Sequence, residues 1–198
     1  DPEGGGGREQ VCRGHLDVSS RRYRTSTRAA TSPVIAPFGA TVELAPGAEL
    51  DRYAVEALIG EGGMAVVYRV RHRALGSLHA LKVLTVTSPK LRDRLVREGR
   101  VQATLQHPNI VGVTDIIDVQ GAPGLIMQFV DGPSLEAWLE EGPQPLSQAE
   151  RIFLGILDAV EAAHAVGVIH RDLKPANVLL ARLPGGLVPR VADFGIAR

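Results

Sequence analysis

The feature that most constrains the fold is a change of pattern near residues 128–132. Before this point, short apolar runs alternate with turn residues, which predicts β-strands. After it, apolar residues recur at helical spacing, which predicts helices. The predicted strands are 53–59, 66–71, 79–84, 111–119 and 125–129, with a helix at 89–105 among them, and they are followed by helices at 134–140 and 147–166 and a hairpin of 178–180 with 188–192. A strand-rich half followed by a helix-rich half predicts an α+β fold with two lobes.

The helix predicted at 147–166 has the clearest end signals. Ser147-Gln148-Ala149-Glu150 matches a capping box, in which the serine and glutamate side chains satisfy each other's exposed amides. Gly167 is placed to end the helix. The core-facing stripe is predicted to consist of Ile152, Ile156, Leu157 and Val160. In the helix at 89–105, by contrast, Gly99 is expected to cost about 1 kcal/mol of helix stability relative to alanine. The last two strands of the first half are predicted to be joined by a Gly-Ala-Pro-Gly turn at 121–124.

Residues 1–48 differ in composition from the rest. Four glycines stand at 4–7, and the stretch 13–32 is rich in arginine, serine and threonine. Such a segment has too few periodic apolar residues to offset chain entropy, so we predict a disordered tail. Its arginines fit a solvated tail better than a contact with an acidic partner. Ordered structure is expected to begin near residue 51, within a domain at 49–198.

Composition excludes several classes of protein. The chain has 22 basic and 22 acidic residues, so no bulk field attracts nucleic acid. The single cysteine, Cys12, excludes an internal disulfide framework and a cysteine-built zinc site. We expect no membrane-spanning helix and no secretory signal, because neither a run of about 18 apolar residues nor a basic segment leading into an apolar one is present. Because the first residue is Asp1 rather than methionine, we expect a fragment or a processed chain.

The chemistry-bearing residues gather in His170-Arg171-Asp172-Leu173-Lys174-Pro175-Ala176-Asn177, followed by Asp193-Phe194-Gly195. Asp172, Lys174 and Asn177 place a base, a cation and an amide oxygen in one short loop. Asp193 adds a carboxylate, and carboxylate and amide oxygens are ligands that Mg²⁺ accepts. So long and ordered a combination does not arise by coincidence, and no grouping of histidine, cysteine and carboxylate competes with it as a metal site.

Two upstream features are weaker when each is taken singly. The segment 60–65 lies between two predicted strands, where glycines let backbone amides approach phosphate oxygens but more often serve only a turn. It is not a Walker A loop, because no Gly-Lys-Ser/Thr follows it. Lys82 stands in an apolar strand, where it either points to solvent or needs an anionic partner. Glu98 on the next helix is the natural candidate for that partner, although a lone helical glutamate is usually solvated.

Taken together and in this order, the blocks resemble those of protein kinases. Lys174, two residues after Asp172, is similar to the serine/threonine branch. The phrases Gly-Glu-Gly-Gly-Met-Ala-Val-Val-Tyr at 60–68 and His-Pro-Asn-Ile-Val at 107–111 are similar to bacterial receptor-type members. The resemblance covers about 51–198 and implies a two-lobed protein kinase-like fold. It implies a β-rich N-lobe at about 51–127, a hinge at 128–132 and an incomplete helical C-lobe at 133–198.

The resemblance also implies a role for each matching position. The loop covering the ATP phosphates would consist of Gly60, Glu61, Gly62, Gly63, Met64 and Ala65. Lys82 would hold the α- and β-phosphates and pair with Glu98. The residues around the adenine would be Ile59, Val67, Ala80 and Leu179, with the backbone of Gln128 and Val130 bonding its edge and Met127 controlling access behind it. Asp172 would accept the proton of the substrate hydroxyl, while Lys174 steadies the transferring phosphoryl group. The metal ligands would be Asn177 and Asp193, with Mg²⁺ as the expected ion and Mn²⁺ as an alternative.

The implied reaction is in-line transfer of the ATP γ-phosphoryl group to serine or threonine hydroxyls of proteins in bacterial-type signalling. The protein would contribute mainly positioning and charge neutralisation. ATP and protein substrates are therefore the expected partners, and nucleic acid is not. The expected location is the cytoplasm, and a membrane anchor downstream of residue 198 is left open.

The chain departs from the kinase pattern at three places. Ala65 replaces the third glycine of the loop and Gln128 stands where glutamate is common, and both changes are minor. The third departure is that the sequence ends at Arg198, before an activation segment and the later helices of the family. We therefore expect an uncovered apolar face on the 147–166 helix and poor folding. We also expect ATP binding with little turnover. A non-catalytic nucleotide-binding or interaction module and a small-molecule phosphotransferase remain as alternatives. The intact set of Lys82, Asp172, Asn177 and Asp193 counts against the first, and Lys174-Pro175 counts against the second.

Overall fold

A computed structural model describes residues 43–62, 65–85 and 89–194, all within one compact unit, Pro37–Arg198. Residues 1–42, for which the tail was predicted, lie outside the described residues, as do Gly63, Met64 and 195–198. Ordered packing extends further toward the N-terminus than residue 49. Leu44 is buried, and its amide donates a hydrogen bond to the Tyr68 hydroxyl at 3.2 Å.

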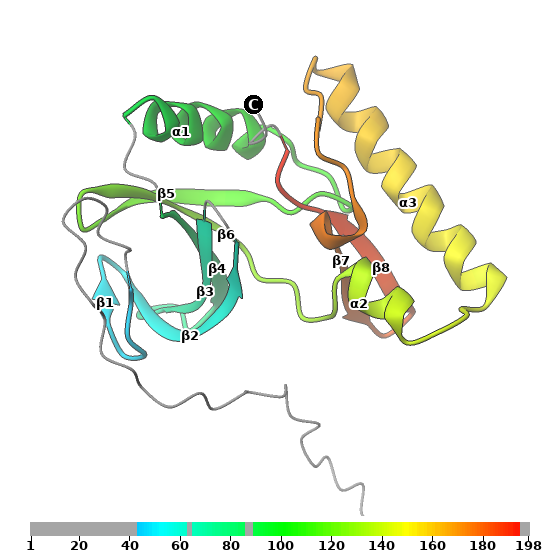
Figure 1. Cartoon of the computed structure of the whole chain (residues 1–198), viewed down its shortest axis with the longest axis horizontal. Helices are drawn as coiled ribbons and strands as arrows, with labels where there is room; N and C mark the ends of the chain where they lie inside the picture. Colours follow the sequence, from blue (N-terminus) through cyan, green and yellow to red (C-terminus); the bar gives the residue numbers. More distant parts are fainter. Residues whose placement is uncertain (1–42, 63–64, 86–88, 195–198) are drawn as a thin grey trace, which may run out of the picture. The chain divides into compact units, whose positions relative to one another are not determined.

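The first half forms a six-stranded antiparallel sheet in the order β1-β2-β3-β4-β6-β5 (Figure 1). The strands are β1 (Glu49–Leu50), β2 (Tyr53–Glu61), β3 (Ala65–His72), β4 (Leu78–Leu84), β5 (Val113–Val119) and β6 (Ala122–Gln128). Each of the five strands predicted here has its counterpart, and the short β1 was not predicted. The turn predicted at 121–124 is wrong: pairing continues to Val119 and Ala122, and Gln120 and Gly121 alone make the turn with positive φ.

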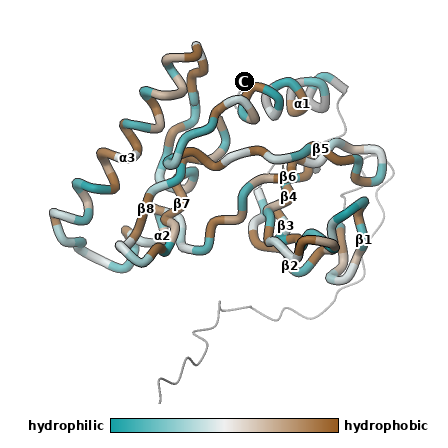
Figure 2. The backbone as a smooth tube through the Cα atoms, turned by 180° about the vertical axis from the view of Figure 1, so that it is seen from behind, coloured by the Kyte–Doolittle hydropathy of each residue, from teal (hydrophilic) through white to brown (hydrophobic). Residues whose placement is uncertain are grey.

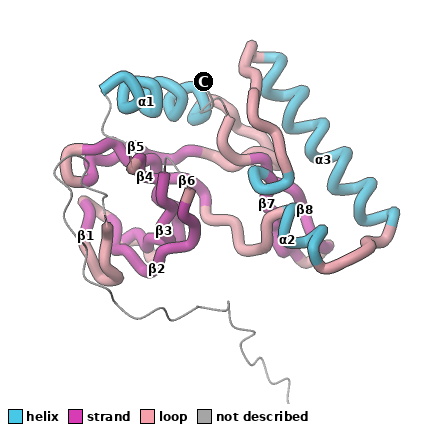
Figure 3. Tube along the Cα trace, in the orientation of Figure 1, coloured by secondary structure: helices cyan, strands magenta, loops and turns pink. Residues whose placement is uncertain are grey.

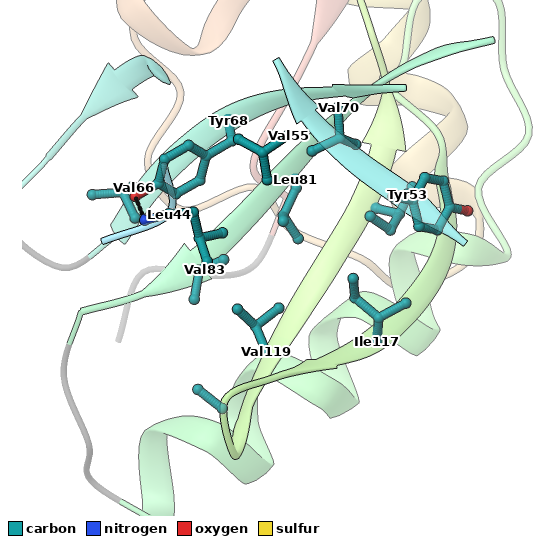
Figure 4. Close-up of a cluster of buried hydrophobic side chains, with 12 residues drawn as sticks. Leu44, Tyr53, Val55, Val66, Tyr68, Val70, Leu81, Val83, Ile117 and Val119 are labelled. Carbon is teal, nitrogen blue, oxygen red and sulfur yellow. Dashed lines mark hydrogen bonds between the residues drawn. The ribbon is translucent and has the colours of Figure 1, made fainter. Parts of the chain in front are cut away.

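The core of this sheet is a cluster of apolar side chains gathered on its concave side (Figure 4). Its labelled members in the figure are Leu44, Tyr53, Val55, Val66, Tyr68, Val70, Leu81, Val83, Ile117 and Val119. Apart from Leu44, which precedes β1, they come from β2, β3, β4 and β5 at alternating positions, as expected for strands with one buried face. The alternation that predicted these strands therefore also identifies their core-facing residues.

Helix α1 (Pro89–Ala103) lies along β5 (Figure 1) and packs on β5 and β6. It ends two residues before the predicted 105. Gly99, which the sequence marked as a weakness, stands where the helix comes closest to the sheet: a Cβ at this position would lie 2.6 Å from Leu125 Cδ2. Close packing of the helix on the sheet thus requires glycine at this position, despite the cost of glycine to the helix itself.

The second half contains α2 (Leu135–Glu140), α3 (Leu146–Ala165), a 3₁₀ turn η1 (Pro175–Asn177) and a two-stranded hairpin of β7 (Val178–Leu183) with β8 (Gly186–Val191). The predicted hairpin is confirmed, with strands longer than expected. Ser134 caps α2, because its hydroxyl oxygen accepts the Ala137 amide at 3.1 Å. Among the described residues, no helix is long and apolar enough to cross a membrane.

The capping box predicted for α3 is wrong. The helix begins one residue earlier, at Leu146, with Pro145 as its N-cap and no side-chain cap, so Ser147 falls inside the first turn. The C-terminal signal is confirmed: Gly167 has φ +77° and donates to His164 O, and Val168 donates to Ala163 O. These two bonds form the Schellman motif that glycine favours.

The predicted core stripe of α3 is only partly correct. The buried positions are Ile152, Gly155, Ala159 and Ala163, and Ile156 packs beside them, whereas Leu157 is 46% exposed. Small residues lie on the buried face because α3 approaches β8 closely: a Cβ on Gly155 would lie 2.7 Å from Pro189 Cγ. Brown segments recur along the tube of α3 in Figure 2, and the exposed apolar face consists of Leu146, Phe153, Leu154 and Leu157.

Two connecting segments, both drawn as loops in Figure 3, attach the sheet to the hairpin. Segment 109–111 runs beside β8, with Val111 N donating to Val191 O at 2.9 Å and Val191 N donating to Asn109 O at 2.7 Å. Segment 131–133 runs beside β7, with Leu180 N donating to Pro133 O at 2.8 Å. Gly132 is required there, because a Cβ would overlap the Leu180 carbonyl. Backbone hydrogen bonds thus fix the hairpin relative to the sheet.

Candidate active site

The loop 170–177 is anchored through His170, which is 4% exposed. The Asp172 amide donates to His170 Nδ1 at 3.3 Å, so Nε2 carries the ring proton and donates to the Ala192 carbonyl at 2.8 Å. The His170 ring also packs against Phe194, with centroids 4.7 Å apart. Arg171 adopts φ +67°, which turns the chain sharply between His170 and Asp172. One histidine therefore holds both the loop and the end of β8.

Asp172 is surrounded by hydrogen-bond donors. Lys174 Nζ lies 3.0 Å from its Oδ2, and Asn177 Nδ2 donates both to Oδ2 at 3.2 Å and to the Asp172 carbonyl at 2.8 Å. The hydrogen bond from Lys174 is the main reason why the pKa of Asp172 is lowered from its ordinary value, and the charge of Lys174 and the hydrogen bond from Asn177 act in the same direction. The lowered pKa keeps the carboxylate ionised and the hydrogen bonds orient it. Because its side chain is 44% exposed, a substrate can reach it.

Asn177 and Asp193 come from two segments that a backbone hydrogen bond holds together. The Ala192 amide donates to Asn177 O at 2.8 Å, which holds the end of β8 against the 3₁₀ turn. Because Asn177 Nδ2 is used by Asp172, its amide oxygen remains as a potential ligand. Asp193 follows with φ +63°, an uncommon conformation for a non-glycine residue that marks a special position of its carboxylate.

Lys82 on β4 is the residue that connects the sheet to this region. Its side chain is 9% exposed, and its Nζ lies 2.7 Å from Asp193 Oδ1. The alternative of a solvated strand lysine is therefore wrong, since a buried ammonium requires an anionic partner and has one. Asp193 is the partner observed here. The side chain of Glu98, the partner expected from the sequence, lies outside the described residues.

The glycine-rich loop joins β2 to β3. Gly60 pairs with Val67, Glu61 pairs with Val66, and the Gly62 amide donates to Ala65 O at 2.9 Å. A Cβ at Gly60 or Gly62 would meet no described atom closer than 3.6 Å, and neither glycine has positive φ. Packing of the described residues does not require these glycines, which fits a loop that must let a ligand approach its backbone. Gly63 and Met64 lie outside the described residues.

The residues predicted to enclose an adenine largely come together. Ala80, Met127 and Val130 are buried in one cluster, and Val67 and Leu179 pack against it. Ile59 is 47% exposed and is not among the residues of that cluster. The Gln128 amide is occupied by a bond to Gly112 O at 2.9 Å, so a ligand at this edge would meet the Gln128 carbonyl and the backbone of Val130.

The donor set available for a metal ion is small. The described residues contain no group of three or more histidine, cysteine, aspartate or glutamate side chains close enough to bind one. Asn177 and Asp193 offer an amide oxygen and a carboxylate, which suit Mg²⁺ because this ion keeps water and phosphate oxygens in its shell. The residues present therefore fit a metal that is bound together with a nucleotide.

Three contacts in and around the site were missed from the sequence. Gln102 of α1 bonds the Val111 carbonyl, Asn109 Nδ2 bonds the Pro189 carbonyl, and Arg190 Nη1 donates to the Gln128 side chain at 3.1 Å. The only signal for the first was a polar residue on the otherwise apolar face that includes Leu95 and Gly99.

Comparison with known proteins agrees with this geometry. The model of the family described as "Protein kinase domain" matches residues 53–198. The serine/threonine-protein kinase PknJ of Mycobacterium tuberculosis is 42% identical over 161 residues, which cover 79% of this chain and 27% of that protein. The serine/threonine-protein kinase PkaA of Streptomyces coelicolor is 40% identical over 162 residues, covering 74% of this chain and 30% of that protein.

Solved structures give the same result. The crystal structure of the Mycobacterium tuberculosis PknI kinase domain superimposes with a TM-score of 0.68 at 33% identity, covering 79% of this chain and 64% of that one. The chain thus spans about a quarter of the length of the curated relatives that it matches and about two thirds of a solved domain.

Proposed function

Because the chain belongs to the protein kinase family, we propose that it transfers the γ-phosphoryl group of ATP to serine or threonine hydroxyls of proteins. Members of this family use ATP and divalent metal ions, and Mg²⁺ is the ion proposed here. A cytoplasmic location is part of the proposal, since ATP is available there.

The observation that carries the proposal is the Lys82–Asp193 ion pair of 2.7 Å. It brings the strand next to the glycine-rich loop together with the segment next to Asp172 and Asn177. The residues proposed as the phosphate-binding cation, the metal ligand and the base are Lys82, Asp193 and Asp172, and each comes from a different part of the chain. Phosphoryl transfer needs this arrangement because its catalysis is mostly positioning and charge stabilisation.

In the proposed mechanism each described residue acts from its observed position. The glycine-rich loop and Lys82 hold the nucleotide phosphates, and Lys82 is oriented by its partner carboxylate. Asp172, ionised and aimed by Lys174 and Asn177, orients the substrate hydroxyl and accepts its proton. Lys174 lies close enough to Asp172 to contact the phosphoryl group as it moves toward that hydroxyl.

Asn177 and Asp193 would hold the metal ion, with the amide oxygen of the first and the carboxylate of the second. When bound, Mg²⁺ neutralises the charge on the β- and γ-phosphates. The hydrogen bond between Ala192 N and Asn177 O keeps these two ligands at a fixed spacing, so the metal site would be preformed.

The test is transfer of ³²P from γ-labelled ATP to casein and to the chain itself, followed by phosphoamino-acid analysis. Since little turnover is expected of this chain, we expect a low but measurable yield of phosphoserine or phosphothreonine with Mg²⁺, and none with the Asp172→Asn variant, which keeps the size of the side chain but removes the base. Nucleotide binding without transfer by the wild-type chain would instead favour the non-catalytic module. Phosphorylation confined to small molecules would favour a phosphotransferase of another specificity.

A further inference from the structure

Helix α1 is attached to the sheet along one face, on which Leu95, Gly99 and Gln102 recur at helical spacing and are all buried. Leu95 fills apolar space and Gly99 allows close approach to Leu125. Gln102 is different, because a polar side chain of which only 1% is exposed must have a hydrogen-bond partner in the protein.

The partner of Gln102 is the carbonyl of Val111, which accepts a hydrogen bond from Gln102 Nε2 at 3.0 Å. Val111 is itself 1% exposed, so water cannot replace this donor. Its amide on the other side donates to Val191 O of β8 at 2.9 Å. A single residue, Val111, therefore joins α1 to β8 through its two backbone groups.

Both elements joined in this way lead to the nucleotide site. Two residues after Val191 comes Asp193, whose carboxylate pairs with Lys82 at 2.7 Å. Four residues before Gln102, one turn earlier in α1, comes Glu98, the second acidic residue expected to act on Lys82. A shift of α1 along its axis would therefore change the spacing between these two acidic residues.

We propose that Gln102 is a positioning residue of the nucleotide site. Its amide holds α1 on segment 109–111, so that the helix carrying Glu98 and the strand leading to Asp193 keep a fixed spacing around Lys82. This inference rests on the proposed phosphoryl transfer and on the role expected for Glu98. An apolar side chain could fill the same space, but it could not fix the position of the helix along its axis, because only the hydrogen bond is directional.

The test compares Gln102→Met, which keeps the length of the side chain but removes the donor, with Gln106→Met, the same change at an exposed position just after α1. We expect kcat to fall about tenfold in Gln102→Met, with KM for ATP changed less than about threefold, since misplaced catalytic groups slow the reaction more than they weaken binding. Gln106→Met should behave like the wild type.

A purely structural role gives a different result. It predicts a lower melting temperature for Gln102→Met but an unchanged kcat at temperatures well below melting, and that outcome would overturn the inference. A double-mutant cycle adds a second criterion. In a Glu98→Gln background the loss of kcat from Gln102→Met should largely disappear, because the two residues act through the same helix position. Fully additive losses would contradict the proposal.

Amide hydrogen exchange provides a measurement that does not depend on activity. We expect Gln102→Met to speed exchange at Val111 and Val191, whose amides lie in the connection to β8, and to leave α3 unchanged. If the wild-type chain transfers no phosphoryl group, the proposed function fails and exchange alone decides the inference. Faster exchange at these two amides supports it, and unchanged exchange overturns it.

Discussion

The two lysine–aspartate pairs of the site are built in opposite ways. Lys82 on β4 and Asp193 just after β8 lie far apart in the sequence and meet with the lysine buried. Lys174 and Asp172 are two residues apart in one loop, and both side chains are about half exposed. The first pair therefore depends on the packing of β4 and β8, whereas the second depends on local loop conformation and is open to salt and solvent.

Lys82→Met should have the largest effect. It removes the buried cation that would hold the phosphates, so we expect kcat/KM for ATP to fall about 10³-fold, as for the loss of a preorganised electrostatic contact. The chain should remain folded, because Met fills similar space and Asp193 keeps some access to water. Steady-state kinetics and thermal melting followed by circular dichroism check both points.

The matched control for this substitution is Lys90→Met, which removes an exposed lysine of α1. It should leave kcat/KM and the melting temperature close to those of the wild type. An equal loss of activity in the two variants would show that overall charge, rather than the buried pair, is responsible.

Lys174→Met should have the next largest effect, with kcat lower by about 10²-fold because a cation near the transferring group is lost. It also tests the local pair. The pKa of Asp172 is lowered mainly by its hydrogen bond to Lys174, so the carboxylate stays charged until the pH falls through that low value. Without Lys174 this pKa should rise toward its ordinary value, and the acidic limb of the kcat profile should move to higher pH.

Added salt distinguishes the two pairs in the same experiment, because it screens the exposed Lys174–Asp172 pair more strongly than the buried Lys82–Asp193 pair. At 1 M salt the Debye length is about 3 Å, so the wild-type acidic limb should move toward that of Lys174→Met. An acidic limb that ignores both salt and the substitution would contradict the assignment of Asp172 as the titrating base.

Gly155→Ala tests how far the long-range pair depends on packing. A Cβ there would lie 2.7 Å from Pro189 Cγ and 2.9 Å from Asn109 Nδ2, so α3 and β8 would have to separate. We expect the free energy of unfolding to fall by about 1–3 kcal/mol, with a further loss of kcat because β8 leads to Asp193. Urea denaturation checks this against Gly112→Ala, where a Cβ would meet nothing within 4 Å.

The loop of the local pair could be predicted from the sequence because its groups are adjacent along the chain. A loop this short keeps its side chains close together. In the structure, Lys174 and Asn177 both lie within hydrogen-bond distance of Asp172. The strands were predictable for a similar reason, since alternation along one segment reports which face is buried. The fold class followed from the order of these segments.

The contacts that were missed all depend on which distant segment lies opposite. From the sequence alone Gly99 only weakens its helix, whereas in the structure it makes room for Leu125. In the same way, nothing in the sequence indicates that Gln102 binds the Val111 carbonyl. The start of α3 failed in a different way: Ser147 fits a capping box by pattern, but the helix begins one residue earlier, after Pro145. A local pattern cannot choose between starts that differ by one residue.

His79, three residues before Lys82 on β4, should show the smallest effect and sharpens the contrast with the buried lysine. Its Nε2 bonds Ser77 Oγ at 2.9 Å, and its buried Nδ1 has no hydrogen-bond partner. Burial first, and then the neighbouring His72, lower the pKa of His79 below 6.5, so the folded state favours the neutral ring. The unfolded state then binds more protons between the lowered pKa and about 6.5, and stability should fall as the pH drops through that range.

Urea denaturation at a series of pH values checks this prediction. His79→Gln should flatten the dependence of stability on pH over this range, and His164→Gln at an exposed position should not. If the wild-type stability does not change over this pH range, His79 takes up a proton as easily in the folded chain as in water. The proposed difference between His79, a buried ring whose protonation is disfavoured, and Lys82, a buried cation stabilised by a carboxylate, would then be wrong.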